Sequence, residues 1–193
     1  MRQTPHGEIL DVFASDAFAV CDHQLAHVYV KNPAKRTEVA AVLSGTAGVA
    51  EVLDDEGKRH HALDHPNSGE LVAVASKGHW FTYYYWLDDA AAPDFARTVD
   101  IHRKPGYDPV ELFVDPKLKL PALRVARRLA QKALGMRYLM DVIPLDATLI
   151  QGSHGRLPDD PLDGPLFLSS RTTSLPDPVP ATAVADLVLA ALA

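Results

Sequence analysis

Two short β-type runs near the N-terminus most constrain the fold of this chain of 193 residues. Ala17–Cys21 reads AFAVC, and Ala26–Val30 reads AHVYV, which is rich in β-branched and aromatic residues. A short continuous apolar run such as the first is typical of a fully buried strand in a parallel sheet. This run ends directly at Asp22-His23, so we predict a buried strand whose end carries a carboxylate and an imidazole.

Strand patterns and helix patterns are mixed along the rest of the chain. The further elements that the sequence predicts are a helix that begins at Asn32-Pro33 and ends at Gly45, strands over Gly48–Leu53, Glu70–Ala75 and His79–Trp86, a turn over Asp54–Gly57, a helix over Pro121–Leu134, an irregular strand over Tyr138–Ile143 and a last helix over Thr182–Leu192. The alternating aromatic residues from Trp80 to Trp86 are expected to pack against the sheet, with base stacking as the weaker alternative. Such a mixture indicates an α/β or α+β protein.

Composition limits the possible partners and surroundings. Acidic residues outnumber basic residues by 25 to 19, for a formal net charge of -6, which argues against a general nucleic-acid binder because such proteins need a basic surface. No run reaches the roughly 18 apolar residues of a membrane span, so we expect no membrane association. The single cysteine, Cys21, excludes an intramolecular disulfide and any zinc site built mainly from thiolates. We therefore expect a soluble protein of a reducing compartment, the cytoplasm, without a secretory signal.

The Asp22-His23 pair is the first candidate site. Ligands of parallel sheets bind at the carboxyl ends of the strands, and carboxylate oxygen and imidazole nitrogen are both good ligands for zinc and similar divalent ions. Both side chains can aim at one ion because the chain turns there. The alternative is a turn carboxylate beside a surface histidine, and the dipeptide alone does not exclude it.

The loop Gly152-Ser153-His154-Gly155 is the second candidate site. Two glycines around a histidine permit backbone conformations that a Cβ atom would exclude. A loop of this kind can hold the imidazole of His154 in one orientation and let a ligand approach closely. The alternative is an ordinary glycine-rich surface turn.

Other histidines and the cysteine favour structural interpretations. His27 lies in a strand pattern and is expected to be packed or hydrogen-bonded rather than a ligand. His60, His61 and His65 lie in a polar loop that is expected to be solvated, although a metal-binding tract is the alternative. Cys21 is flanked by apolar residues and is expected to be inert.

A third candidate segment, Asp100–Pro109, reads DIHRKPGYDP. Arg103 and Lys104 can engage a phosphate, and Tyr107 can orient a neighbouring group or close a loop, so Arg103 and Tyr107 are candidate substrate-binding residues. The alternative is a structural crossover segment that is interrupted by proline and glycine and is held by ion pairs between Asp and Arg. No glycine-rich loop with Walker or Rossmann spacing and no nucleophile elbow occurs, so no catalytic residue is assigned.

The order of these features resembles a known family. An apolar strand ends in Asp22-His23, the Gly152–Gly155 loop follows much later, and a proline-rich stretch leads into the apolar C-terminal sequence PATAVADLVLAAL. This order is similar to the C-terminal part of the alkaline phosphatase superfamily, in its type I phosphodiesterase/nucleotide pyrophosphatase branch. Members carry a strand-terminal Asp-His pair, usually followed by Gly where this chain has Gln24, and a later Gly-x-His-Gly loop. The resemblance implies an α/β chain, part of an α/β/α sandwich with a small inserted α+β subdomain.

The resemblance also implies a two-metal phosphoric ester hydrolase. Asp22 and His23 would be ligands of one divalent metal, and His154 a ligand of the other, with two zinc ions in the complete enzyme. The metals would polarise and clamp the oxygens of a phosphate-ester substrate. Nucleotide diesters, sugar-phosphate esters and phosphonates all stay open as substrates.

The family's first metal-binding Asp, its nucleophilic Thr or Ser and its Asp-x-x-x-His pair come before the Asp-His motif. Only 21 residues precede Asp22, and three ligands are too few for two zinc ions that each want about four. We therefore expect residues 1–30 to carry sheet strands with the Asp-His motif, 31–115 an inserted subdomain and crossover loop, and 116–193 the return to the main sheet. We also expect this chain alone to be inactive without the N-terminal part.

Two alternative functions remain. One is a non-catalytic binding or regulatory module that kept the end of the fold and pairs with a missing N-terminal part or another copy of itself. The other is a single-metal hydrolase in which Asp22, His23 and His154 form a three-ligand site with an open position for water.

Overall fold

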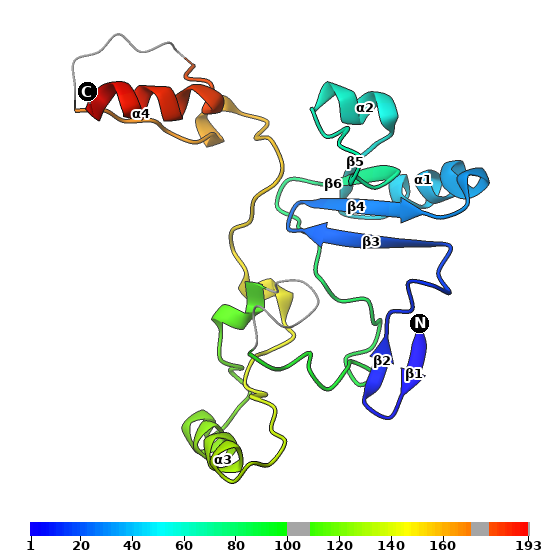
Figure 1. The fold of residues 1–193 in the computed structure, drawn as a ribbon, viewed down its shortest axis with the longest axis vertical. Coiled ribbons are helices and arrows are strands. Elements are labelled where there is room, and N and C mark those ends of the chain that lie inside the picture. The colour runs from blue at the N-terminus through cyan, green and yellow to red at the C-terminus, as the bar shows by residue number, and fades with distance from the viewer. Residues whose placement is uncertain (100–108, 171–177, 193) are drawn as a thin grey trace. The chain divides into compact units, whose positions relative to one another are not determined.

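The computed structural model describes residues 1–99, 109–170 and 178–192 (Figure 1). Contacts within the chain divide it into two compact units, Met1–Arg156 and Leu157–Ala193. Sheets and helices are mixed, which confirms the α/β class and is consistent with an alkaline-phosphatase-like fold. The three-part division expected from the sequence stays a prediction. Short 3₁₀ helices span Pro33–Lys35, Pro109–Leu112, Ala147–Leu149, Pro161–Asp163 and Ala181–Ala183.

A four-stranded sheet forms the centre of the first unit. Its strands are β3 (Ala17–Asp22), β4 (Leu25–Val30), β6 (Leu71–Ala75) and β5 (Val49–Leu53), in the order β3-β4-β6-β5. All neighbouring strands in it are antiparallel, as the opposed arrows of β3 and β4 illustrate in Figure 1. The expectation of a parallel sheet is therefore wrong. A two-residue link joins β3 to β4, whereas parallel neighbours need a crossover of about a dozen residues or more.

The strand β3 is less buried than its apolar sequence predicts. It lies at one edge of the sheet, and its Val20 side chain is 52% exposed. The neighbouring strand β4 alternates instead, with Ala26, Val28 and Val30 buried. The prediction of a fully buried strand is wrong because an edge strand is flanked by a neighbour on one side only.

The helix α1 (Arg36–Ser44) packs on this sheet, and together with the 3₁₀ helix Pro33–Lys35 it fills the range in which the sequence predicts a helix. The Asn32 side chain accepts a hydrogen bond from the Ala34 N–H at 3.0 Å, and Gly45 follows the last helical residue. Among its side chains, Val39 and Leu43 pack against a buried cluster of the sheet. That cluster consists of Val28, Val30 and Leu71.

A second helix, α2 (Asp55–His60), replaces the turn predicted over Asp54–Gly57. The Asp54 carboxylate accepts hydrogen bonds from the N–H groups of Glu56 and Gly57, both at 3.0 Å. An N-terminal cap of this kind satisfies donors that a helix end leaves unpaired. The polar run is therefore the start of a helix.

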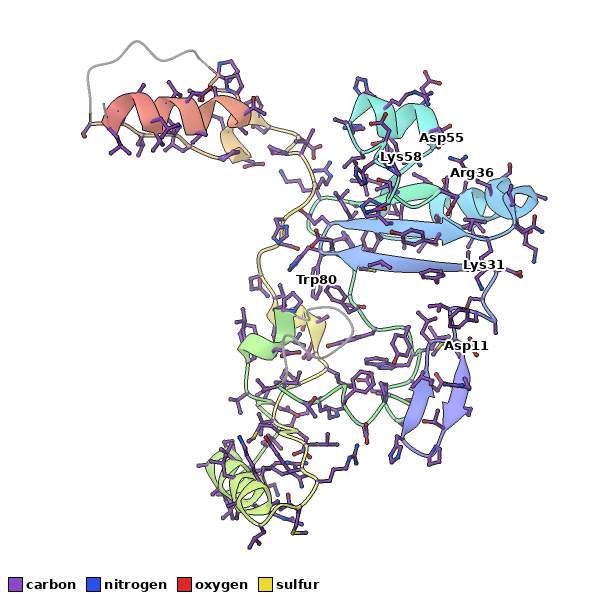
Figure 2. The ribbon with its side chains drawn as sticks, in the orientation of Figure 1. Asp11, Lys31, Arg36, Asp55, Lys58 and Trp80 are labelled. Atoms are coloured by element: carbon purple, nitrogen blue, oxygen red, sulfur yellow. The ribbon has the colours of Figure 1, made fainter. Side chains whose placement is uncertain are left out.

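An ion pair ties α2 to α1, and hydrogen bonds from the same cations reach the segment before β6. Arg36 and Lys58 both contact the Asp55 carboxylate, with nitrogen–oxygen distances of 2.7 and 3.1 Å (Figure 2). Lys58 is buried and also donates to the backbone carbonyl of Gly69 at 2.8 Å, while Arg36 donates to that of Glu70 at 2.6 Å. Both cations therefore reach the segment that leads into β6.

The aromatic segment His79–Trp86 is irregular, so the prediction of a strand there is wrong. The strand β6 already pairs with β4 on one side and β5 on the other, so it has no free edge with which a further strand could pair. Instead, the rings of Tyr84 and Trp86 stack with centroids 4.7 Å apart, and Trp86 packs with Ala96 and Leu145 in a separate core cluster.

The helix α3 (Pro121–Ala133) ends one residue before its predicted limit. Its Val125 packs against a buried cluster. The members of that cluster are Val110, Val142 and Ile143. The strand predicted over Tyr138–Ile143 is reduced to a single antiparallel bridge between Thr98 and Asp141.

A small hairpin, β1 (Arg2–Thr4) with β2 (Gly7–Ile9), precedes the main sheet and was not predicted. The N–H of Glu8 donates to the carbonyl of Ala91 at 2.8 Å, which ties this hairpin to the segment after the aromatic run.

The helix α4 (Val184–Leu192) lies in the second unit, where the sequence predicts a helix. Among the residues that the structure describes, every helix is too short or too polar to cross a membrane.

Candidate metal centre

The turn between β3 and β4 presents two of the predicted donors. Asp22 is the last residue of β3 and pairs with Leu25, which leaves His23 and Gln24 as a two-residue turn. The φ of His23 is +55°, in the left-handed region that residues other than glycine rarely adopt. Positive φ at the first turn residue alone is what a type II′ hairpin turn requires. The unusual backbone of His23 thus follows from the tightness of the link.

The predicted glycine-rich loop brings the third donor to this turn. The carbonyl of His154 accepts a hydrogen bond from the backbone N–H of Gln24 at 2.9 Å. The imidazole rings of His23 and His154 lie with centroids 4.0 Å apart and planes tilted by 43°. The two candidate motifs of the sequence, far apart along the chain, therefore meet in space.

Gly155 permits this close approach. Its φ is +111°, a conformation open to glycine. A Cβ atom at this position would lie 3.4 Å from the carbonyl oxygen of Asp22 and 3.4 Å from the backbone nitrogen of Gln24. The prediction that a glycine beside His154 has a conformational role is confirmed for Gly155, whereas Gly152 has no positive φ.

The segment after β6 holds the turn from another direction. The backbone N–H of Phe81 donates to the carbonyl of His23 at 2.7 Å, and the side-chain amide of Gln24 donates to the carbonyl of His79 at 3.0 Å. The carbonyl of Gln24 accepts from the N–H of Ala75 at 2.9 Å. Backbone hydrogen bonds thus fix the turn on several sides.

The three donors fit a divalent metal. Asp22, His23 and His154 each offer a ligand atom within 4.8 Å of the others, and this is the one such group among the described residues. One carboxylate oxygen and two imidazole nitrogens are a donor set that suits zinc and similar ions. Ligand atoms around one zinc lie roughly 3–3.5 Å apart, and paired metals about 3.5–4 Å apart, so the spacing accommodates either one ion or two.

The candidate substrate residues Arg103 and Tyr107 lie outside the described residues.

The prediction for His27 is confirmed, since its Nδ1 accepts a hydrogen bond from the N–H of Gly69 at 3.3 Å. Burial raises the pKa of the Cys21 thiol to about 11, which agrees with the expected inert cysteine because the reactive form is the thiolate.

His60, His61 and His65 are exposed, as predicted, but His60 is the last residue of α2 and not part of the loop. The rings of His60 and His61 contact each other edge to face, with centroids 5.0 Å apart. These histidines form no group of three metal donors among the described residues.

Sequence reasoning missed Trp80 as a neighbour of the site. Its ring centroid lies 6.3 Å from that of His23, with the planes tilted by 37°. Figure 2 places Trp80 near the turn end of the β3-β4 hairpin. The expectation of sheet packing was inferred from the whole aromatic run, and no local signal separated Trp80 from the rest.

Comparison with known proteins bears on this site. A family model described as type I phosphodiesterase / nucleotide pyrophosphatase matches residues 6–108, more than half of the chain. This chain belongs to that family. The family acts on phosphate-ester small molecules and is typically metal-dependent. The resemblance inferred from the sequence is thereby confirmed. No curated protein and no solved structure matches the chain.

The phosphodiesterase family match contains Asp22, His23 and Trp80, while His154 lies beyond it. The pairing of His154 with the Asp-His motif therefore rests on the geometry of this chain and not on the extent of the match.

Proposed function

We propose that Asp22, His23 and His154 are metal ligands of a phosphoric ester hydrolase, and that this chain contributes only part of a two-metal site. The observation that carries the proposal is the convergence of the three donors within 4.8 Å in a chain of the phosphodiesterase family. Two zinc ions would need about eight ligands, so the remaining ligands and the nucleophile would have to come from groups other than these three side chains.

Each residue of the site contributes a donor that follows from its chemistry. Asp22 contributes negative charge and an oxygen donor, while His23 and His154 contribute nitrogen donors whose backbone positions the turn and the loop fix. A divalent metal bound there supplies Lewis-acid polarisation of a phosphoryl oxygen and, in a pair, a clamp on the attacking and leaving oxygens. Arg103 and Tyr107 are proposed to bind substrate, since a guanidinium group can engage phosphate oxygens in pairs.

Zinc binding to the whole chain tests the ligand assignment. In competition with a chromogenic chelator, we expect a dissociation constant of about micromolar or tighter. Alanine substitution of Asp22, His23 or His154 should weaken zinc binding by about 100-fold or more. Even the loss of a group that only supports a metal ligand lowers metal affinity about 10–100-fold. The control is His60→Ala, which removes an exposed histidine outside the group. Equal affinity of His154→Ala and His60→Ala would refute the assignment.

Hydrolysis of a chromogenic phosphodiester tests the claim that the site is partial. We expect no turnover from this chain with added zinc. Turnover that disappears in His154→Ala would overturn the claim of incompleteness while supporting the site itself.

The same convergence favours one second candidate, a single-metal hydrolase. Three protein ligands with a fourth position open to water are what catalytic zinc sites have. Metal content of the purified chain separates the two: one ion per chain together with turnover favours the single-metal hydrolase. One ion without turnover favours the partial two-metal site.

A further inference from the structure

The imidazole of His23 has aromatic neighbours on two elements. The ring of His154 lies 4.0 Å away between centroids, and the indole of Trp80 lies 6.3 Å away. Trp80 and His23 are both half-buried, whereas His154 is exposed. Trp80 is therefore the less solvated of the two ring neighbours of His23.

The backbone around Trp80 is attached to the same turn. The residue before it, His79, accepts a hydrogen bond from the side-chain amide of Gln24 at 3.0 Å. The residue after it, Phe81, donates its N–H to the carbonyl of His23 at 2.7 Å. Because both sequence neighbours of Trp80 are hydrogen-bonded to the turn, the backbone that carries the indole is held beside the residue that carries the imidazole.

We infer that Trp80 is a positioning residue for the metal ligand His23. This inference rests on the proposed function, because it assumes that His23 binds metal. Groups that hydrogen-bond to a metal ligand fix the orientation of its ring, and their removal typically lowers metal affinity about 10–100-fold. A packed indole restricts the same ring without a hydrogen bond, so its effect is expected at the lower end of that range. A smaller side chain at position 80 leaves space beside the imidazole, so more of its orientations compete with the one that binds metal.

The position of Trp80 also gives it a reporting role. Its indole lies beside a ligand ring, so a paramagnetic ion such as Co²⁺ bound by His23 quenches its fluorescence. The second tryptophan, Trp86, belongs to a separate buried cluster and donates its indole N–H to Asp89 at 3.1 Å. Metal-dependent quenching should therefore come mainly from Trp80.

The experiment titrates Co²⁺ into the whole chain and into its variants, with visible absorption and tryptophan fluorescence as readouts. We expect Trp80→Ala to lower Co²⁺ affinity about tenfold and to alter the Co²⁺ absorption bands, which report ligand geometry. Trp80→Phe retains an aromatic ring and should stay within about threefold of the unsubstituted chain. Trp80→Phe should also lose most of the tryptophan fluorescence quenching that Co²⁺ causes. The control is Phe13→Ala, which removes an aromatic side chain that is 91% exposed and should change neither readout.

The outcomes separate this inference from the proposed function. If alanine at Asp22, His23 or His154 weakens binding while Trp80→Ala binds Co²⁺ with unchanged affinity and spectrum, the role of Trp80 is refuted and the function stands. If none of the three ligand substitutions weakens binding, the function itself fails. If Trp80→Ala does not fold, Trp80→Phe decides, because unchanged quenching in it contradicts the inference.

Discussion

Gly155 is the residue on which the approach of the loop to the hairpin depends most directly. Its φ of +111° is strained for any residue with a Cβ atom. An added Cβ would also meet two backbone atoms of the turn, the Asp22 oxygen and the Gln24 nitrogen, at 3.4 Å. These contacts have ordinary van der Waals length, so the backbone conformation and not steric overlap sets the cost of a substitution.

Gly155→Ala is expected to lower the free energy of unfolding by about 1–3 kcal/mol, the range for a residue held in a sparsely populated backbone region. Zinc affinity should fall with it, because relief of the strain moves His154 away from the turn. Denaturant unfolding and chelator competition measure the two effects.

The matched control is Gly152→Ala, three residues earlier in the same loop. Nothing lies within 4 Å of the Cβ it would add, and its φ is not in the left-handed range. Alanine there should be neutral or stabilising by up to about 1 kcal/mol through the unfolded chain. Equal stability losses in the two variants would show that the loop has no special conformation at Gly155.

At the scale of elements, α3 is anchored by one carboxylate. Arg128 donates to Asp141 through Nε and Nη2, both at 2.7 Å, and Arg124 donates through Nη2 at 2.5 Å. Burial raises the pKa of Asp141, but the hydrogen bonds from Arg128 and Arg124 outweigh it and hold that pKa well below its usual range. The ionised form of Asp141 is therefore favoured by folding.

This lowered pKa predicts a pH dependence of stability. Because the folded pKa of Asp141 lies below its unfolded value of about 3.9, the stabilisation is fully present above that value and is lost as the pH falls toward the folded pKa. Asp141→Asn should cost about 1.5–3 kcal/mol at pH 7, the range for hydrogen bonds to charged groups, and less at pH 3. Urea unfolding at both pH values measures this change.

The control for Asp141 is Asp64→Asn, which neutralises an exposed loop carboxylate. Its effect on stability should be small and similar at pH 7 and pH 3. A stability loss for Asp141→Asn that does not shrink on acidification would contradict the role assigned to the ionised carboxylate and its two arginine partners.

Local patterns predicted most of the elements because their signals are local. The cap at Asn32 locates the 3₁₀ helix Pro33–Lys35 that leads directly into α1, and the stop at Gly45 locates the end of α1. Apolar runs locate β3 to β6 within a residue or two. The helix α2 was also within reach: Asp54 can cap it, Asp55 and Glu56 suit its first turn, and basic residues end it. The glycine inside that run favoured a turn instead.

Strand partners depended on information that a local pattern lacks. The continuous run AFAVC fits either a buried parallel strand or an apolar edge strand, and only the short link to β4 separates the two. The alternating aromatic residues after β6 fit a strand, yet both sides of β6 were already occupied. Pairing in a sheet is decided by all its strands together.

The site shows the same division between local and long-range information. Residue chemistry made the Asp22-His23 pair and the His154 loop candidates, the family resemblance implied their roles as metal ligands, and the fold brings the three residues within 4.8 Å. The contact of Trp80 with His23 arises where a segment after β6 returns to the hairpin turn, and nothing in the sequence near Trp80 indicates that return.

At the scale of the whole chain, the candidate donors belong to one unit. Asp22, His23 and His154 all lie in Met1–Arg156, as do the backbone hydrogen bonds that hold the turn and the loop. The described residues of the second unit, which spans Leu157–Ala193, contribute no member to this group of donors. Metal binding should therefore be separable from the second unit.

A chain cut after Arg156 is expected to bind zinc within about threefold of the full chain, because it retains every donor and Gly155. The matched control ends four residues earlier, after Gly152, and lacks His154 and Gly155. Its affinity should fall by about 100-fold or more, as for loss of a direct ligand. Circular dichroism of both shortened chains checks that the sheet is retained, and chelator competition measures zinc. If the two shortened chains bind zinc equally, His154 is not a ligand; if both fold and both lose binding, residues of the second unit belong to the site.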